Sequence, residues 1–303
     1  MKRFILRLSA FLLLLMVTDY IIGDIGYYLF SRSKQGATYK IRYLSDLSKD
    51  SVVIFGSSRA VHHYKPSIIE DSINMTCYNA ANDGCGIIYN YGIFTVITSR
   101  YIPKFIIYDI CPKYDLFEGD NEVYLTNLKL YYGKGEIQKI FEKINYKENL
   151  KMLSQMYKYN SQLISMFSDY KTPKNDTPIN KGYAPKYNIM NYEPKPNPDF
   201  TKLQPLDSIK IFYLEKLITE CKRLNIKLCF TVSPCYKYTN DSILNSVKKL
   251  SNKYGILFID HFDNTYISTD AKYWADGVHL NDQGATAWTS MFIHELKETK
   301  LWQ

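Results

Sequence analysis

The sequence predicts an α/β protein, a three-layer α/β/α sandwich with helices on both faces of a five-stranded parallel sheet. Short, largely apolar runs alternate along the chain with longer stretches of helical pattern, which is typical of a parallel sheet. Several of these runs are almost continuously apolar, as strands buried on both faces are. The five expected strands are residues 51–56, 75–79, 105–109, 226–232 and 256–260.

The first half of the chain contains three of these strands. The run Ser51-Val-Val-Ile-Phe-Gly56 ends in glycine, and a helical pattern follows from Pro66 to Ser72. Glycines punctuate the turn after the second strand, and residues 87–101 are expected to form the next helix. The pair Pro103-Lys104 then leads into the third strand.

The second half returns to the same alternation. Asp207 or Ser208 is placed to cap the first helix, and Gly255 ends the second. No internal repeat is visible. The three helices expected here are residues 206–224, 240–254 and 282–297.

Between the two halves, a segment from about residue 115 to residue 205 interrupts the alternation. Amphipathic helical patterns occur at 136–144 and 150–167, and a polar stretch rich in Pro, Asn, Lys and Tyr runs from 171 to 199. Loops of that length are uncommon and often functional. The insertion is therefore expected to form either a lid or substrate wall, or a plain surface excursion.

The amino terminus carries an apolar stretch from about residue 8 to residue 30. It is long enough to span a bilayer only if Asp19 and Asp24 lie near the outer interface. A cleavable signal peptide is the alternative, but no clear small-x-small cleavage site follows. We expect an uncleaved anchor over residues 1–32 and one domain over residues 33–303; a buried helix of a soluble protein is a weaker alternative.

Positive charges at the start of the chain predict the orientation of this anchor. Lys2, Arg3 and Arg7 would place the amino terminus in the cytoplasm. The chain after about Ser31 would then lie outside the inner membrane, in the periplasm. If the segment were cleaved, the domain would be secreted.

The composition excludes some classes of protein. The net charge is +8, but the lysines are scattered and no nucleic-acid-binding motif is present. The 28 tyrosines are a hint of sugar binding, since tyrosine stacks well on flat apolar faces. None of the six cysteines forms a C-x-x-C pair, and some of them could pair as disulfides outside the cytoplasm.

The first segment that could carry chemistry is Gly56-Ser57-Ser58-Arg59, where the first strand meets its helix. Glycine permits a tight backbone there, and a serine at a helix start has backbone N–H groups beside it. That arrangement suits a nucleophile, although a serine that merely caps the helix would look the same.

Two further segments fall where a parallel sheet binds ligands. Asp276 precedes His279 by three residues, so its carboxylate can reach the imidazole and hold its tautomer. Residues 79–84, after the second strand, end in Gly84, whose amide could face a developing oxyanion. Taken alone, each segment could equally be an ordinary surface loop or turn.

The order and spacing of these three segments resemble the SGNH, or GDSL-like, hydrolase family. The resemblance runs from about residue 51 to the end of the chain, interrupted by the insertion, and implies the flavodoxin-like SGNH fold. It implies Ser58 as nucleophile, Asp276 and His279 as its relay, and the amides of Ser58 and Gly84 as oxyanion donors. Gly-Ser-Ser-Arg in place of G-D-S is similar to the extracytoplasmic, membrane-anchored branch of the family.

One block departs from the family pattern. Residues 109–115, after the third strand, contain no asparagine, so the third oxyanion donor is unassigned. Lys113 or Tyr114 could substitute, or Asn82 could reach in from the neighbouring loop. Tyr114 is also a candidate for substrate binding.

Arg59 and the two histidines after it have alternatives of their own. Arg59 could hold an anionic substrate group or bridge to a neighbouring loop. His62 and His63 are expected to lie on the surface or line the substrate site, because adjacent helical residues point about 100° apart and rarely share a metal.

The resemblance implies acyl transfer through a serine ester, without a metal or diffusible cofactor. The expected substrate is an acylated carbohydrate or related cell-envelope polymer, acted on by an esterase. An O-acyltransferase that modifies an extracytoplasmic polysaccharide is the first alternative. A non-catalytic protein for polysaccharide binding or assembly is the second.

Overall fold

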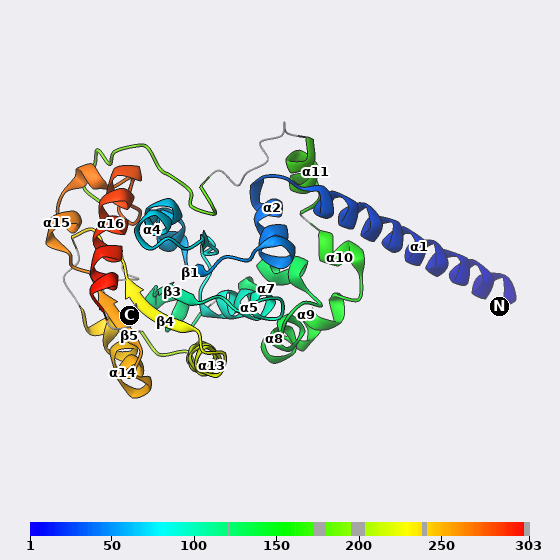
Figure 1. The fold of residues 1–303 in the computed structure, drawn as a ribbon. Helices are drawn as coiled ribbons and strands as arrows, with labels where there is room; N and C mark the ends of the chain where they lie inside the picture. The colour runs from blue at the N-terminus through cyan, green and yellow to red at the C-terminus, as the bar shows by residue number, and fades with distance from the viewer. Residues whose placement is uncertain (120, 161, 172–179, 195–203, 238–240, 300–303) are drawn as a thin grey trace.

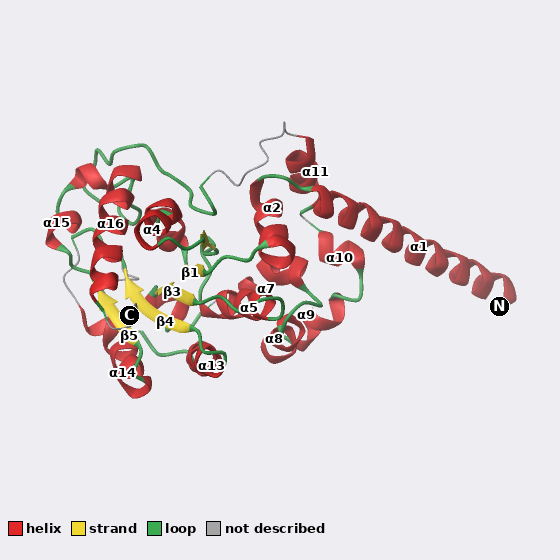
Figure 2. Cartoon of the chain, viewed as in Figure 1, coloured by secondary structure: helices red, strands yellow, loops and turns green. Residues whose placement is uncertain are grey.

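Five parallel strands form one sheet at the centre of the computed structural model, in the order β2-β1-β3-β4-β5 (Figures 1 and 2). The strands are β1 (Val52–Gly56), β2 (Cys77–Asn79), β3 (Phe105–Asp109), β4 (Lys227–Val232) and β5 (Leu257–Asp260). The structure describes all residues except 120, 161, 172–179, 195–203, 238–240 and 300–303. The α/β fold class and the five-stranded parallel sheet predicted from the sequence are confirmed.

The strand order places the carboxyl ends of β1, β2 and β3 side by side. Gly56 at the end of β1 pairs with Asp109 at the end of β3, and Ile54 pairs with Asn79 of β2. The chain moves outward from β1 to β2, then returns and continues through β3 to the other side. This reversal next to β1 is the switch point where open parallel sheets bind ligands.

Helices cover both faces of the sheet, since every residue of β1 is buried and successive residues join different cores. Val53 and Phe55 pack beneath α5 (Ile87–Thr98), α13 (Ser208–Arg223) and α14 (Asn245–Tyr254). Val52 and Ile54 belong to a second core whose helical residues come from the other face. The helices of that face are α3 (Ser58–His63), α4 (Pro66–Ile73), α15 (Thr265–Ser268) and α16 (Asp282–Glu298).

The insertion after β3 is a set of short helices. The single helical pattern expected over residues 150–167 is in fact broken into the end of α9, then α10 and α11, and Ser154 caps the start of α10. Among its described residues, the helices are α6 (Pro112–Asp115), α7 (Val123–Leu128), α8 (Ile137–Ile144), α9 (Tyr146–Lys151), α10 (Gln155–Tyr159) and α11 (Leu163–Lys171). In the part of the chain that the structure describes, 3-10 turns lie at residues 129–131, 241–244 and 271–273.

Much of the polar stretch expected at 171–199 lies outside the described residues, but residues 180–194 are placed. Lys181 accepts a hydrogen bond from the amide of Asn79, so this segment lies along the edge strand β2. Ala184 then bonds to Val61, and Lys186 accepts from the amide of Asp282. The described part of the insertion therefore reaches the carboxyl edge of the sheet.

Before the sheet, the chain forms α1 (Lys2–Arg32), α2 (Gly36–Arg42) and a π-helical turn (Tyr43–Leu47). Among the described residues, α1 alone is long and apolar enough to cross a membrane. It extends away from the rest of the molecule, with its last turns beside α10 and α11 (Figure 1).

The tight turn after β1 depends on the absence of a side chain at Gly56. Its φ is +149°, and an added Cβ would lie 2.6 Å from the Cβ of Ala60 and 2.9 Å from the carbonyl oxygen of Asp109. We expect Gly56→Ala to lower the free energy of unfolding by about 2–5 kcal/mol, from backbone strain and overpacking together. Denaturant unfolding of the full chain in detergent, followed by tryptophan fluorescence, measures this change.

Gly84→Ala is the matched control for that variant. Gly84 also has a positive φ of +65°, but an added Cβ would meet nothing within 4 Å. Only the left-handed backbone cost of about 1–2 kcal/mol is expected there. Equal losses in the two variants would contradict the steric explanation at Gly56.

Candidate active site

The first group of the candidate site is the hydroxyl of Ser58, which opens helix α3 directly after the turn at Gly56. Ser57 occupies the N-cap position in an extended conformation without a side-chain cap bond, and Ser58 is the first helical residue. Ser58 is half-buried, whereas Ser57 is buried. The turn thus presents Ser58, rather than Ser57, at the carboxyl edge of the sheet.

Ser58, His279 and Asp276 form a continuous chain of hydrogen bonds. The Oγ of Ser58 lies 2.8 Å from Nε2 of His279, although 221 positions separate them in the sequence. Nδ1 of His279 lies 3.0 Å from each carboxylate oxygen of Asp276. With Nδ1–H donating to Asp276, Nε2 is free to accept the proton of Ser58.

The carboxylate of Asp276 is held in place by the backbone of its own loop. The amides of Val278 and His279 both donate to its Oδ1 at 2.9 Å, and the ammonium of Lys186 lies 3.8 Å from Oδ2. Burial raises the pKa of Asp276, but the bonds from His279 and the two amides outweigh it, so the pKa falls below its usual value. Asp276 is therefore ionised in the folded protein at neutral pH.

A buried polar network supports the loop that carries His279. Nε2 of His63 accepts the amide of Leu280 at 3.0 Å, and Nδ1 lies 2.9 Å from Oγ of Ser233. Ser233 in turn bonds Asp109, at 2.8 Å through its amide and 3.2 Å through its hydroxyl. Burial, aided by the charge of Arg59, lowers the pKa of His63 well below its ordinary value, so this imidazole is neutral.

Arg59 belongs to this network and does not face the site. Its side chain is 1% exposed, and its guanidinium donates to the carbonyl and the hydroxyl of Ser233 and to the carbonyl of Pro234. Of the two roles expected for Arg59, the structure shows contact with a neighbouring loop. Its burial contradicts the role of substrate binding, because a ligand cannot reach the guanidinium.

The loop after β2 runs alongside the Ser58 turn. The amide of Ala80 donates to Ile54 and that of Asn82 to Gly56, which carries the loop to within two residues of Ser58. Gly84 lies beyond it, exposed and in the left-handed region. The side-chain amide of Asn82 points at the thiol of Cys85, 3.2 Å away. Oxyanion roles for Gly84 and Asn82 stay predictions.

The segment after β3 also lies at this edge. An added Cβ at Gly86 would lie 2.1 Å from the carbonyl oxygen of Tyr114, so α6 packs tightly on the loop after β2. Tyr114 is half-buried and packs against the larger core, with the ammonium of Lys113 5.5 Å from its ring centroid. No hydrogen bond that the structure shows for the described residues joins either side chain to Ser58, and their roles stay predictions.

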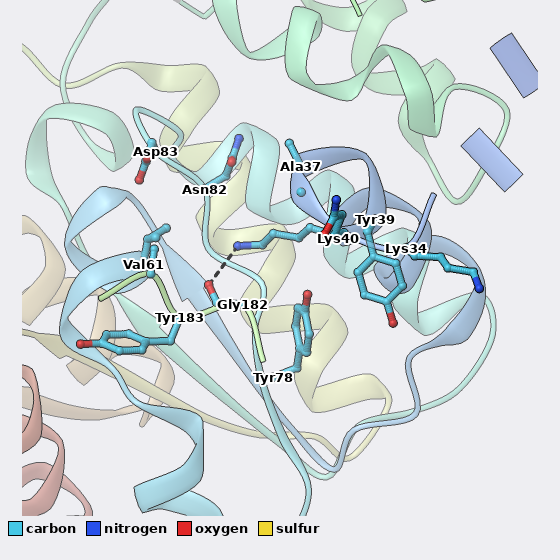
Figure 3. Close-up of a pocket in the computed structure, with 13 residues that line it drawn as sticks. Lys34, Ala37, Tyr39, Lys40, Val61, Tyr78, Asn82, Asp83, Gly182 and Tyr183 are labelled. Atoms are coloured by element: carbon cyan, nitrogen blue, oxygen red, sulfur yellow. Dashed lines mark hydrogen bonds between the residues drawn. The ribbon is translucent and has the colours of Figure 1, made fainter. Parts of the chain in front are cut away.

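A cleft of about 450 Å³ adjoins the loop after β2 (Figure 3). Its walls come from α2, β2, α3, the loop after β2 and the insertion, with Tyr39 and Tyr78 on one side and Val61 and Tyr183 on the other. The ammonium of Lys40 points into the space between them. The remaining lining residues are Lys34, Gln35, Gly36, Ala37, Asn82, Asp83, Gly182 and Ala184.

Lys40 is held by two backbone carbonyls at the floor of the cleft. Its ammonium donates to Ala81 at 2.5 Å and lies 3.5 Å from the carbonyl oxygen of Gly182. Burial lowers the pKa of Lys40 to about 8, and the charge of Asp83 opposes this shift. An ammonium has three N–H donors, so one can serve a ligand in the cleft.

His62 connects the cleft with the serine and histidine. Its ring lies edge-on to that of His279, with centroids 5.0 Å apart, and its Nδ1 is 2.6 Å from the carbonyl oxygen of Ala184 in the cleft wall. Its Nε2 lies 3.7 Å from Asp83. His62 is thus placed beside the site, as expected, whereas His63 is buried beneath it, which the sequence did not indicate.

All six cysteines are free and buried, so the structure contains none of the disulfides that the sequence left open. Cys111 lies at the start of α6, where burial raises the pKa of its thiol to about 12. Cys85 accepts hydrogen bonds from the amides of Asn82 and Asn127. These thiols act as packing groups near the site rather than as nucleophiles.

The carboxyl of Asp115 is fully buried at the end of α6. It accepts bonds from the hydroxyl of Tyr108 at 2.7 Å and the amide of Cys111 at 2.6 Å, yet burial raises its pKa to about 7. A carboxyl with a raised pKa in the folded state stabilises the fold fully below about pH 4 and loses that contribution as pH rises through about 7. Wild-type protein is therefore expected to lose stability between pH 5 and pH 8 relative to Asp115→Asn.

Denaturant unfolding of both proteins at the two pH values measures this difference. The exposed neighbour Glu118 provides the control, since Glu118→Gln should follow the wild type at both values. A wild-type-minus-Asp115→Asn difference that stays constant with pH would show that Asp115 is already ionised in the fold.

Comparison with known proteins adds a similarity of fold. No protein-family profile matches the chain, and no curated protein matches it in sequence. A solved structure assigned as a lipolytic protein of the G-D-S-L family, from Desulfitobacterium hafniense DCB-2, is similar with a TM-score of 0.40 and 8% identity. That alignment covers 80% of this chain and 97% of the other.

A second solved structure, assigned as an acylhydrolase from Bacteroides fragilis NCTC 9343, has a TM-score of 0.39 and 12% identity. The alignment covers 86% of this chain and 99% of that one. Similarity at this level is too weak to transfer a site or an activity. The chemistry of the present site therefore rests on its own geometry.

Proposed function

We propose that this protein is an ester hydrolase of the SGNH type, with Ser58 as nucleophile, His279 as general base and Asp276 as its partner. One observation carries the proposal: the three side chains form an unbroken hydrogen-bonded chain from Ser58 to Asp276 at the switch point of the sheet. A serine bonded to an imidazole, itself bonded to a carboxylate, is the arrangement that activates a hydroxyl for acyl transfer, and here the carboxylate is half-buried.

The reaction follows from the positions of the protons. His279 takes the proton of Ser58 at Nε2 while Oγ forms a bond to the ester carbonyl carbon. The resulting imidazolium is stabilised by the ionised Asp276. His279 then gives the proton to the departing alcohol oxygen as the C–O bond of the ester breaks, which leaves an acyl group on Ser58. Water, deprotonated by His279, releases the acid and restores the serine.

The oxyanion of this reaction needs donors near Ser58. We assign the amide of Ser58 at the start of α3, and that of Gly84, whose backbone is open to solvent. A single donor is worth about 2.7–4 kcal/mol of transition-state stabilisation. Asn82 or Tyr114 is proposed as the third donor after a small movement of its side chain, because both lie on loops at the same edge of the sheet.

The substrate that this account favours is an O-acylated glycan of the cell envelope. The cleft beside His62 is large enough for a sugar residue and combines tyrosine rings with the ammonium of Lys40. In this proposal the cleft binds the sugar of the substrate, while the ester to be cleaved lies at Ser58. If α1 is retained as a membrane anchor, the domain lies on the outer side of the inner membrane. The enzyme then has access to envelope polymers.

The same cleft makes an O-acyltransferase the second candidate. A sugar hydroxyl that reached Ser58 from the cleft would compete with water for the acyl group, and His62 joins the two places, since it bonds Ala184 of the cleft wall and contacts His279. The two activities differ only in the acceptor.

Product analysis with the full chain in detergent separates the candidates. The protein is incubated with p-nitrophenyl acetate, with and without a glycan acceptor, and both acetate and acetylated glycan are measured. Acetate as the main product supports the hydrolase. Faster turnover with the acyl group recovered on the glycan supports the transferase. Equal rates for wild type and Ser58→Ala would refute both and leave a non-catalytic binding protein.

Lys40 provides a test of the cleft as the substrate site. Lys40→Gln keeps a donor for the carbonyl of Ala81 but removes the charge, so we expect KM for an O-acetylated glycan to rise roughly tenfold. Turnover of p-nitrophenyl acetate, which does not fill the cleft, should change little. Steady-state kinetics on both substrates checks this, with the distant exposed Lys253→Gln as control. An unchanged KM for the glycan would remove the cleft from substrate binding.

A further inference from the structure

Helix α1 has two parts that differ in their surroundings. Every residue from 1 to 17 is exposed, whereas Gly23, Gly26, Leu29 and Phe30 are buried against the insertion. An added Cβ at Gly23 would lie 2.8 Å from Gln155, and one at Gly26 would lie 2.6 Å from the ring of Tyr159. The second part of α1 is therefore packed on α10 and α11 as part of the folded domain.

Asp19 marks the junction between the two parts. Its carboxylate accepts hydrogen bonds from the hydroxyl of Ser154 at 2.6 Å and from the amides of Gln155 and Met156, each at 2.8 Å. These are the unpaired donors at the start of α10, so a residue of one helix caps another. Removal of α1 would uncap α10 and expose its buried face, which argues that α1 is retained.

The free part of α1 ends where the packed part begins, at Asp19. With the free part of α1 in a bilayer, the packed part and the helices that contact it lie outside the hydrocarbon core, because their backbone and polar groups are bonded to the domain. The outer surface of the bilayer therefore falls near Asp19, at the level of the α9–α10 turn (Figure 1).

The α9–α10 turn carries apolar side chains that nothing else in the described chain covers. Leu153 is 82% exposed and directly precedes Ser154, which bonds Asp19; Met156, which bonds Asp19 through its amide, is 47% exposed. Tyr146 and Leu150 precede Leu153 at spacings of seven and three residues, on one face of a helical turn, and are also exposed.

Charges around this face match a membrane surface. Lys147 and Lys151 of α9 are exposed beside the apolar residues. The carboxylate of Glu148 is turned away from solvent, half-buried, and bonds Lys151 and Tyr157. An apolar face flanked by lysines is the pattern of helices that lie in the lipid headgroup layer.

We propose that the α9–α10 turn, with Leu153 and Met156 at its centre, inserts into the outer headgroup layer beside α1. The bilayer then holds the domain at two points, the anchor and the turn, and the Asp19 contact sets the angle between them. This proposal does not depend on the esterase activity. It concerns how the domain is oriented, and it fixes the height of the candidate site above the membrane.

Site-specific fluorescence in a bilayer tests the proposal. The six native cysteines are buried, so Leu153→Cys can be labelled selectively with an environment-sensitive nitrobenzoxadiazole (NBD) probe. The full chain is placed in nanodiscs of phosphatidylethanolamine and phosphatidylglycerol, some of which carry nitroxide lipids. Tyr266→Cys is the matched control, since Tyr266 is 64% exposed and lies on α15 at the end of the molecule opposite α1 (Figure 1).

The probe at position 153 is expected to emit at shorter wavelength than the probe at 266 and to lose most of its fluorescence to nitroxide lipids. Identical spectra and quenching at the two positions would overturn the proposal. A blue shift at 153 without lipid quenching would also overturn it, because a second protein surface would then cover the turn.

Intact-mass measurement shows whether α1 is present, and a mature chain that lacks it would likewise overturn the proposal. Matched thermal unfolding of the labelled variants confirms that both are folded.

Discussion

Ser58→Ala is expected to lower kcat for ester hydrolysis by roughly 10⁶-fold, the largest effect among the substitutions considered for this protein. The alanine removes the oxygen that lies 2.8 Å from Nε2 of His279, so no acyl-enzyme can form. The fold should be unaffected, because the Ser58 side chain supplies no helix cap and Ser57 holds the N-cap position. Initial rates with p-nitrophenyl acetate and an unchanged unfolding midpoint check both statements.

Ser57→Ala is the matched control, one residue away in the same turn. The Ser57 hydroxyl is buried and lies near the thiol of Cys111, away from the imidazole. We expect activity within a few-fold of wild type. If Ser57→Ala abolished the activity and Ser58→Ala preserved it, the assignment of the nucleophile would be wrong.

Asp276→Asn should have the second largest effect, a loss of about 10⁴-fold in kcat. Asparagine can still accept the amides of Val278 and His279 through its oxygen, so the loop should keep its shape. Its NH₂ group would face Nδ1 of His279 and force that nitrogen to become an acceptor. Nε2 would then carry the proton and could no longer take one from Ser58.

Kinetics at pH 7 to 8 measures this loss, with Asp270→Asn as the control. Asp270 also accepts a bond from a backbone amide two residues later, that of Lys272, but at an exposed position outside the site. A change in kcat of less than about tenfold for Asp276→Asn would mean that the carboxylate does not set the tautomer of His279.

The strands were predictable because their sequences are short apolar runs bounded by polar or glycine residues. Phe105–Asp109 was predicted to the residue, and the other four strands differ at their first residues only. Asp207 was one of two expected caps, and it does cap α13 through the amides of Ile209 and Lys210. The helices of the insertion were harder, because the cap at Ser154 breaks the amphipathic pattern expected over residues 150–167.

The catalytic candidates could be found from sequence because each is part of a local motif. The buried polar network that supports these residues could not be found from sequence. Its members His63, Ser233 and Asp109 come from three segments that only the folded sheet brings together. The sequence left two roles open for Arg59, substrate binding or contact with a neighbouring loop, and could not choose between them for a related reason. An arginine next to a polar turn appears exposed, and only the packing of the loop after β4 shows that it is buried.

Long-range contacts also explain what was missed at the cleft and the anchor. Lys40, Asn82 and Tyr183 line one cleft but lie far apart in the chain, and no local pattern marks them. Asp19 interrupts an apolar stretch, and the sequence showed only that it would have to lie near the outer interface of a membrane span. In the structure it caps α10, a role that depends on a helix more than 130 residues later.

Covalent labelling of the full-length protein tests the central claim most directly. A fluorophosphonate reacts with a serine only where an imidazole activates it and an oxyanion site receives the phosphonyl oxygen. Peptide mass spectrometry is expected to find the adduct on Ser58 in wild type and to find none in His279→Ala. No adduct on the folded wild-type protein, or an adduct on another serine, would contradict the account.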